Sequence, residues 1–107
     1  DTVGTVITLP GQVQFTGSWS FVTPPAFQKD RVVVTGEKGQ LEFSVFSFED
    51  IVLIIEGKEE HISIQPPEHI QMPMIQSIVN ELNGIGSCPS TGKSAAVCSR
   101  VMDQICL

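Results

Sequence analysis

Basic side chains are scarce in this chain of 107 residues. Six Lys and Arg stand against twelve Asp and Glu, which gives a formal net charge of −6. The basic residues are spread along the sequence and form no cluster. Nucleic acids and anionic membrane surfaces both bind proteins through a basic patch. The charge pattern therefore argues against a nucleic-acid partner and against a membrane surface as a partner.

Long apolar runs and low-complexity tracts are also missing. No stretch approaches the roughly 20 consecutive apolar residues that a membrane-spanning helix needs. Hydrophobic residues make up 41% of the chain, which is ordinary for a folded protein and argues against disorder. The length suits one hydrophobic core. We therefore expect a single domain over residues 1–107, with no membrane partner.

Cysteine is sparse, and its pattern excludes two classes of small protein. Cys88, Cys98 and Cys106 are odd in number, widely spaced and without a CxxC pair, whereas a disulfide scaffold has a denser, even set. A zinc site would need a fourth ligand, and His61 and His69 lie far away in the sequence. We expect three reduced thiols, a cytoplasmic location and no metal site.

The first two thirds of the sequence read as β-strands joined by turn residues. Pro10-Gly11 suits a type II turn, "GEKG" (Gly36 to Gly39) suits a hairpin, and Gly57-Lys58 suits another turn. Alternation of apolar and polar residues marks a half-buried antiparallel strand, most clearly over Val13 to Phe21. The expected strands are Val3 to Leu9, Val13 to Phe21, Arg31 to Thr35, Leu41 to Val45, Ile51 to Glu56 and Glu60 to Ile64.

The last third changes to a helical period. Pro73 suits the first position of a helix, and Asn83-Gly84 suits its end. A second helix is expected to begin near Ser90 or Thr91, either of which can cap it. The apolar positions at helical spacing are Ile75, Ile78, Val79 and Leu82 in the first helix and Val97, Cys98, Val101 and Ile105 in the second.

Strands followed by helices predict an α+β fold, with a mainly antiparallel, open-faced sheet and two C-terminal helices packed on one face. The face expected to meet the helices holds Phe15, Trp19, Phe21, Leu41, Phe43, Ile51 and Leu53. The other face is expected to mix polar residues with the apolar residues Val32, Val34, Phe46, Val52 and Ile54. An apolar patch on an open sheet indicates a partner surface, and we predict a homo-oligomer through these five residues. The alternative is scattered surface side chains with no role.

The stretch "GSCPSTGKSAA" (Gly86 to Ala96) is similar to a phosphate-binding loop, but it departs from that motif in several ways. Five residues separate Gly86 from Gly92 where the motif has four, and a helix precedes the stretch where the motif needs a strand. Pro89 also removes one of the backbone donors. We interpret the stretch as a helix start. Lys93 is unusual in a first turn, where the helix dipole favours Glu.

The sequence offers few other candidates for catalytic residues. Glu59, Glu60 and His61 could serve acid–base chemistry, but they fall on a hairpin where charges usually face solvent. His69 beside Glu68 lies in a loop before a helix, where it could be catalytic, could cap the helix or could have no role, and the last is favoured. No Ser/His/Asp arrangement has local motif support. We predict no catalytic, cofactor-binding or metal-binding residue in this chain.

Four stretches together resemble one protein family. They are "GTVITLPGQVQFTGSWSF", "VVVTGEKGQLEFSVF", "PPEHIQMPMIQSIVNELNG" and "CPSTGKSAAVCSRVMDQI", and they span nearly the whole chain. The combination resembles the C-terminal half of the glucose–fructose oxidoreductase/inositol dehydrogenase (Gfo/Idh/MocA) family. The "TGEKGQLEF" hairpin and the "PSTGKSA" helix start carry the resemblance most specifically, although relatives are expected to have Glu where Lys93 stands.

The resemblance implies a two-domain NAD(P)-dependent oxidoreductase that acts on sugars, cyclitols or related diols. It also implies that the open face of the C-terminal sheet packs against a second subunit. The family binds its cofactor in an N-terminal Rossmann domain through a glycine-rich turn and carries a catalytic lysine in an E-K-P motif, followed by an Asp/His pair. No GxGxxG, E-K-P or D-x-x-x-H occurs here, so no catalytic residue is carried over.

The resemblance therefore predicts an excised C-terminal domain whose Rossmann partner would lie upstream of Asp1 in the same polypeptide. Such a domain would be inactive alone, and NAD or NADP is expected in the parent enzyme rather than in this chain. A second hypothesis is a stand-alone binding or oligomerisation module without catalytic activity. A third, a nucleotide site at Gly92-Lys93-Ser94, is disfavoured by the departures described above. A leader removed before Asp1 is a further possibility at this end of the chain.

Overall fold

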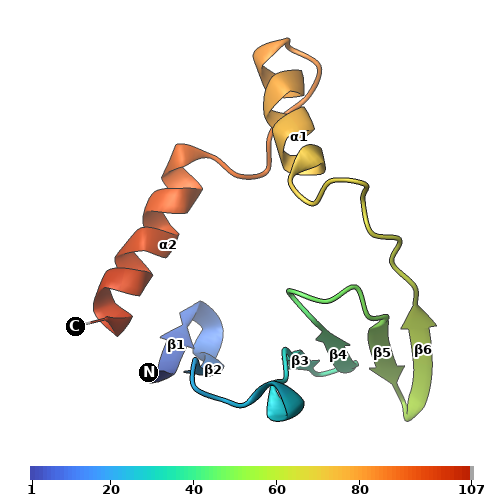
Figure 1. Ribbon diagram of the computed structural model, residues 1–107, viewed down its shortest axis with the longest axis vertical. Helices are drawn as coiled ribbons and strands as arrows, with labels where there is room; N and C mark the ends of the chain where they lie inside the picture. The colour runs from blue at the N-terminus through green and yellow to red at the C-terminus, as the bar shows by residue number, and fades with distance from the viewer. Residues whose placement is uncertain (107) are drawn as a thin grey trace. The chain divides into compact units, whose positions relative to one another are not determined.

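The computed structural model describes residues 1–106, and in them six strands precede two α-helices (Figure 1). The predicted α+β fold class, with antiparallel strands and C-terminal helices, is confirmed. The strands form two sheets rather than the one that the sequence predicted. One is a two-stranded hairpin of β1 and β2, and the other has four strands in the order β3-β4-β5-β6.

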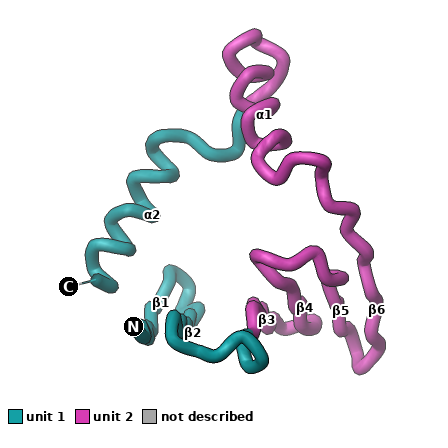
Figure 2. The backbone as a smooth tube through the Cα atoms, viewed as in Figure 1, with its two compact units in different colours: residues 1–28, 88–107 teal, residues 29–87 magenta. Residues whose placement is uncertain are grey.

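The chain divides into two compact units, which Figure 2 shows in different colours. The first comprises Asp1–Gln28 with Cys88–Leu107, and the second comprises Lys29–Ser87. The first unit holds the hairpin and the last helix, and the second holds the four-stranded sheet and the other helix. A single domain over the whole chain stays a prediction.

The first unit begins with the hairpin of β1 (Thr2–Leu9) and β2 (Val13–Ser20). Leu9 pairs with Val13, so a three-residue turn, Pro10–Gln12, joins the strands. Gly11 takes φ +79° in this turn, a backbone conformation that glycine adopts without a steric penalty. The turn lies where the Pro10-Gly11 pair predicts it.

One face of this hairpin is apolar because the register brings the odd-numbered residues together. Trp19 lies opposite Val3, and Phe15 lies opposite Ile7. The Phe15 and Trp19 rings are tilted at 34° with centroids 6.4 Å apart, a geometry typical of attractive aromatic pairs. Between them, the Trp19 ring lies over Gly17, where a Cβ would collide with it. Glycine at this position therefore lets the Trp19 ring lie across the strand, and a larger residue would make the ring move.

The second unit contains a meander of four short strands, β3 (Val32–Gly36), β4 (Gly39–Phe43), β5 (Ile51–Ile55) and β6 (Lys58–Ile62). The outer two connections of this meander are two-residue turns, because Gly36 pairs with Gly39 and Ile55 pairs with Lys58. Gly39 lies directly against the backbone carbonyl of Ile54 on the next strand, and a Cβ there would clash with that oxygen. The β4–β5 pairing therefore requires a glycine at the start of β4.

The register of these four strands separates the sheet into two unlike faces. Val34, Leu41 and Leu53 lie directly opposite one another on one side, whereas Gln40 and Ile54 lie opposite each other on the other side. We call the first side the apolar face; its members in β3, β4 and β5 are Val32, Val34, Leu41, Phe43, Ile51, Leu53 and Ile55. We call the second side the mixed face; its members are Val33, Thr35, Gln40, Glu42, Val52, Ile54, Glu59 and His61.

Helix α1 (Met72–Leu82) begins one residue before Pro73, the predicted first position, and ends as the sequence predicts. Pro73 lies in its first turn, where the missing N–H costs nothing. After Asn83, Gly84 turns the chain with φ +73°, and the Ile85 N–H bonds back to the Asn80 carbonyl at 2.8 Å. This is the usual glycine-assisted helix end, which satisfies one of the orphan carbonyls.

Helix α2 (Gly92–Ile105) is capped by Thr91, one of the two predicted caps. The Thr91 hydroxyl accepts a hydrogen bond from the Ser94 N–H at 3.3 Å, and the Ser94 hydroxyl accepts one from the Thr91 N–H at 2.9 Å. This reciprocal pair is a capping box in which Ser94 takes the place of the usual Glu or Gln. Lys93 therefore lies one position before the box residue and displaces no cap. Among residues 1–106, neither helix is long and apolar enough to cross a membrane.

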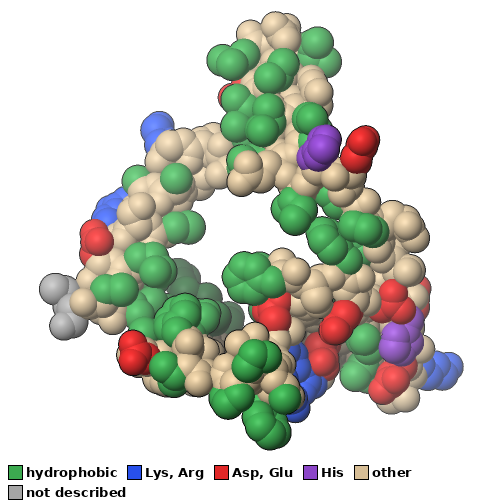
Figure 3. All heavy atoms as spheres, viewed as in Figure 1, with side chains coloured by type: hydrophobic (Ala, Val, Ile, Leu, Met, Phe, Trp, Pro, Cys, Tyr) green, Lys and Arg blue, Asp and Glu red, His purple; other side chains and the backbone are tan. Residues whose placement is uncertain are grey.

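Apolar side chains remain largely exposed in both units. Among residues 1–106, Cys88 is the one apolar side chain that is buried, at 7% exposure. The extensive contacts between elements in this part of the chain are all contacts between paired strands. Figure 3 shows hydrophobic side chains over much of the visible surface. The predicted packing of the helices on a sheet face stays a prediction.

The turn between β5 and β6 offers a test of backbone strain. Glu56 and Gly57 both have positive φ, +51° and +76°, as a type I′ hairpin turn requires. A left-handed conformation costs most residues about 1 kcal/mol, and Asn tolerates it best after glycine. We expect Glu56→Asn to raise the free energy of unfolding by roughly 0.5 kcal/mol in urea denaturation. The control Glu60→Asn, in the extended strand β6, should give no gain; equal effects of the two changes would contradict the strain argument.

Candidate functional site on the mixed face of the four-stranded sheet

The five residues predicted to form a partner surface do not lie together. Val52 and Ile54 are on the mixed face, but Val32 and Val34 are on the apolar face, opposite Phe43 and Leu41. The prediction that these four residues share a face is therefore wrong. The reason is geometric: pairing of Gly36 with Gly39 places Val34 directly across from Leu41, so the two side chains must point to the same side.

Phe46, the fifth predicted residue, lies outside the strands. It follows the end of β4 at Phe43, in a bend of the chain, and its side chain is 87% exposed. This loop is organised around the carboxylate of Asp30. The carboxylate oxygen Oδ2 accepts hydrogen bonds from the Val45 N–H at 2.8 Å, from the Phe46 N–H at 2.5 Å and from the Ser44 hydroxyl. Asp30 thus fixes the backbone that presents Phe46.

These hydrogen bonds stabilise the charged form of Asp30. The Ser44 hydroxyl and then the Phe46 N–H lower the pKa of the Asp30 carboxyl below its ordinary value, because each donates to the carboxylate. The Ser44 hydroxyl oxygen in turn accepts from the Ser47 N–H at 2.9 Å, which closes the loop on itself. A short acidic side chain therefore serves here as an internal anchor rather than as a reactive group.

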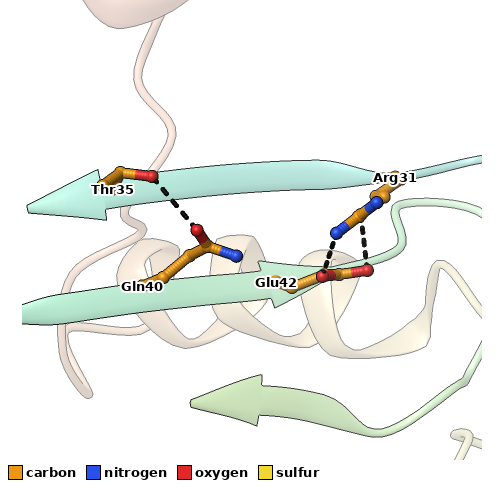
Figure 4. Close-up of polar contacts among 4 residues, drawn as sticks. All are labelled: Arg31, Thr35, Gln40 and Glu42. Carbon is orange, nitrogen blue, oxygen red and sulfur yellow. Dashed lines mark hydrogen bonds and ion pairs between the residues drawn. The ribbon is translucent and has the colours of Figure 1, made fainter. Parts of the chain in front are cut away.

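Polar side chains from β3 and β4 cross-link the mixed face. The guanidinium of Arg31, just before β3, holds both carboxylate oxygens of Glu42 at 2.5 Å. The Thr35 hydroxyl donates a weaker hydrogen bond to the Gln40 amide oxygen at 3.4 Å. Figure 4 shows both contacts bridging the same two strands. The two charges of the Arg31–Glu42 pair therefore neutralise each other across β3 and β4.

His61 lies between two carboxylates on the same face. Its Nδ1 is 3.8 Å from Asp50 Oδ2, and its Nε2 is 3.9 Å from Glu59 Oε2. Both distances exceed a hydrogen bond, and all three side chains are substantially exposed. The predicted trio is also divided, because Glu60 lies opposite Leu53 on the other side of the sheet. The group is a solvated charge cluster rather than an acid–base pair held for catalysis.

The described residues form a shallow hollow, but it lies on the apolar side of the sheet and away from these polar groups. Val34, Leu41, Leu53 and Ile55 line it together with the Gly36 to Gly39 turn. Within residues 1–106, the structure holds no group of three His, Cys, Asp or Glu arranged to bind a metal. The described residues of the mixed face form an open surface and no enclosed site for chemistry.

Two features of this region were missed by the reasoning from sequence. Val33 belongs to the mixed face beside Glu42, and Asp30 anchors the loop that follows β4. The place of Val33 could have been found by counting outward from the two-residue "GEKG" turn. Asp30 had no sequence signal, because its three partners lie 14 to 16 residues further along the chain.

Comparison with known proteins found a relative that is similar in sequence to this chain. Over 94 residues the chain is 33% identical to a protein named "Oxidoreductase P35" from Formosa agariphila. The matched stretch covers 88% of this chain, and the chain spans 28% of the length of that relative. No family model and no solved structure matches the chain.

The Asp30 anchor predicts a pH dependence with a definite sign. Because the fold lowers the pKa of Asp30, its contribution to stability is present above the ordinary Asp pKa of about 3.9 and is lost as pH falls through the lower folded value. We expect Asp30→Asn to flatten the acid end of the stability–pH curve and to speed amide exchange at Val45 and Phe46. Asp103→Asn, on α2, should leave both unchanged. Protected Val45 and Phe46 amides in Asp30→Asn would contradict the anchor.

Proposed function

We propose that this chain is a C-terminal sheet domain of an oxidoreductase, and that the parent enzyme uses NAD or NADP on a sugar, a cyclitol or a related diol. The single observation that carries the proposal is the 33% identity, over 88% of this chain, to a protein named as an oxidoreductase. The Gfo/Idh/MocA resemblance of the strand and helix motifs supports the nicotinamide cofactor and the substrate class.

The residues of this chain do not themselves fit a dinucleotide. A dinucleotide fingerprint needs a glycine-rich turn from a strand into a helix. Here the glycine-bearing stretch from Gly86 to Gly92 joins two helices, and Thr91 and Ser94 satisfy each other's backbone groups. We therefore assign cofactor binding and the redox chemistry to the part of the parent enzyme outside this chain, and we derive no catalytic step from the residues described here.

The role that remains for this chain is to supply a scaffold and a surface. We propose that the mixed face is the surface through which two copies associate. Its apolar side chains Val33, Val52 and Ile54 come from two strands, Arg31 and Glu42 beside them neutralise each other, and the charged residues Glu59 and His61 lie at the edge strand β6. Such a mixture of apolar and paired polar groups suits a protein partner better than it suits water.

The oxidoreductase proposal is tested first at the level of the gene. We expect the reading frame upstream of Asp1 to encode a GxGxxG turn, an E-K-P and a D-x-x-x-H, and we expect the full-length protein to reduce NAD or NADP with a member of a sugar and cyclitol panel. A start codon directly before Asp1 would contradict the proposal. In calorimetry, the isolated chain should bind neither cofactor, and micromolar binding would show that the assignment of the cofactor to the missing part is wrong.

The association surface is tested by charge insertion on the mixed face. We expect Ile54→Glu to shift the full chain from dimer to monomer in light scattering, because it would bury two unpaired carboxylates against each other across the interface. Thr16→Glu, on the polar side of the β1–β2 hairpin, is the matched control and should leave the mass unchanged. A wild-type chain that is already monomeric, or an Ile54→Glu chain that stays dimeric, counts against this surface and leaves the oxidoreductase proposal standing.

A further inference from the structure

The end of helix α1 carries a pair of residues with a chemistry of its own. Asn83 is followed by Gly84, and this is the one Asn-Gly pair in a chain that has two asparagines and no Asp-Gly pair. The backbone nitrogen of the glycine in such a pair can attack the amide carbon of the asparagine side chain, because glycine has no Cβ to obstruct the approach. Asparagine is a thermolabile residue in proteins. The pair is therefore a candidate site of covalent modification.

The reaction uses water as its one co-reactant. The Gly84 nitrogen forms a bond to Asn83 Cγ, the Cγ–Nδ2 bond breaks, and the amide hydrogen of Gly84 leaves with Nδ2 as ammonia. Water then opens the resulting cyclic imide at one of its two carbonyl carbons. Opening at Cγ gives an aspartate, and opening at the backbone carbon gives an isoaspartate, in which the main chain runs through the former side chain. In both products a neutral amide has become a carboxylate.

The pair is open to solvent. Asn83 and Gly84 are both exposed. Apart from the neighbours of Gly84 in the chain, no atom of the described residues lies within 4 Å of the point where a Cβ on Gly84 would stand. Steric cover by the described part of the chain therefore does not decide whether the pair reacts.

The backbone of the folded helix end holds the pair in an unreactive geometry. The ψ angle of Asn83 is 3°, which brings the Gly84 nitrogen in line with the Asn83 backbone nitrogen and turns it away from the Asn83 side chain. The Gly84 N–H also donates a hydrogen bond to the Glu81 carbonyl at 3.0 Å. Attack on Cγ requires a rotation about this ψ angle and the loss of this hydrogen bond. The last turn of α1 must therefore open before the pair can react.

The products of the reaction would weaken the same turn. The helix dipole makes a carboxylate unfavourable at the C-terminal end of a helix. The last turn of α1 contains no basic residue to offset the new charge, and Glu81 already lies in that turn. An isoaspartate also lengthens the main chain between the Asn80 carbonyl and the Ile85 N–H, which are hydrogen-bonded at 2.8 Å. Modification therefore favours the open form of the turn.

We propose that Asn83 is a site of spontaneous deamidation, and that the folded last turn of α1 protects it. The folded turn suppresses the reaction, opening of the turn permits it, and the new carboxylate then keeps the turn open for longer. The proposal is independent of the oxidoreductase proposal, because it depends on the backbone geometry and hydrogen bonds of residues 79–85.

The proposal is tested by incubation of the full chain at fixed pH and temperature, followed by peptide mass spectrometry and an isoaspartate assay. We expect conversion at Asn83 and none over the same period at Asn80, which precedes Glu81 inside the helix. We also expect conversion at Asn83 to be about tenfold or more slower in the folded chain than in the chain unfolded by guanidinium. Equal rates in the two states, no conversion in the unfolded chain, or conversion first at Asn80 would each overturn the proposal.

Two variants at position 80 test the protection without changing the reacting pair. Asn80→Ala strengthens the last turn and Asn80→Gly weakens it, and both lose the hydrogen bond from the Gln76 amide equally. We expect conversion at Asn83, and amide exchange at Gly84 and Ile85, to be about fivefold faster in Asn80→Gly than in Asn80→Ala. Equal conversion in the two variants would overturn the protection. If Asn80→Gly unfolds the helix outright, Asn80→Ala must still convert more slowly than the wild-type chain, and an unchanged rate would overturn the proposal.

Discussion

The arrangement of the second unit depends on the length of its two tight turns. A two-residue connection leaves no freedom in register, and a shift of one residue would send every side chain of a strand to the opposite face. Pairing of Gly36 with Gly39 sets β3 against β4, and pairing of Ile55 with Lys58 sets β5 against β6. These two turns decide which side chains of β3 and β4, and which of β5 and β6, share a face, and the β4–β5 pairing joins the two pairs into one apolar and one mixed face.

The glycines at these turns have different physical roles. Gly57 supplies a positive φ, which the turn needs for its hand. Gly39 is needed because a Cβ at this position would collide with the Ile54 carbonyl oxygen of the neighbouring strand. One therefore shapes a connection, and the other permits two strands to approach. Gly17 resembles Gly39 in this respect, because the Trp19 ring lies where a side chain on Gly17 would stand.

Local features of the fold were predictable from the sequence, and pairings between distant segments were less so. The strands lay within a few residues of their predicted bounds, as did the helix starts at Pro73 and Thr91, because period, caps and turn residues are local signals. The assignment of Val32 and Val34 to the face of Val52 is wrong because alternation within one strand does not show which of its faces continues on the next strand; the two-residue turn between them decides that. The separation of β1 and β2 from the other strands, and the Asp30 anchor, depend on contacts that no short window of sequence displays.

The position of Trp19 over Gly17 in the hairpin determines what the fluorescence of this protein reports. The chain has one tryptophan and no tyrosine, so its near-ultraviolet emission comes from a single ring in the β1–β2 hairpin. An emission signal therefore reports on the first unit and is silent about the four-stranded sheet. Far-ultraviolet dichroism sums over both. If the emission and dichroism transitions do not coincide during denaturation, the two units differ in stability. One sample then yields two separate melting curves.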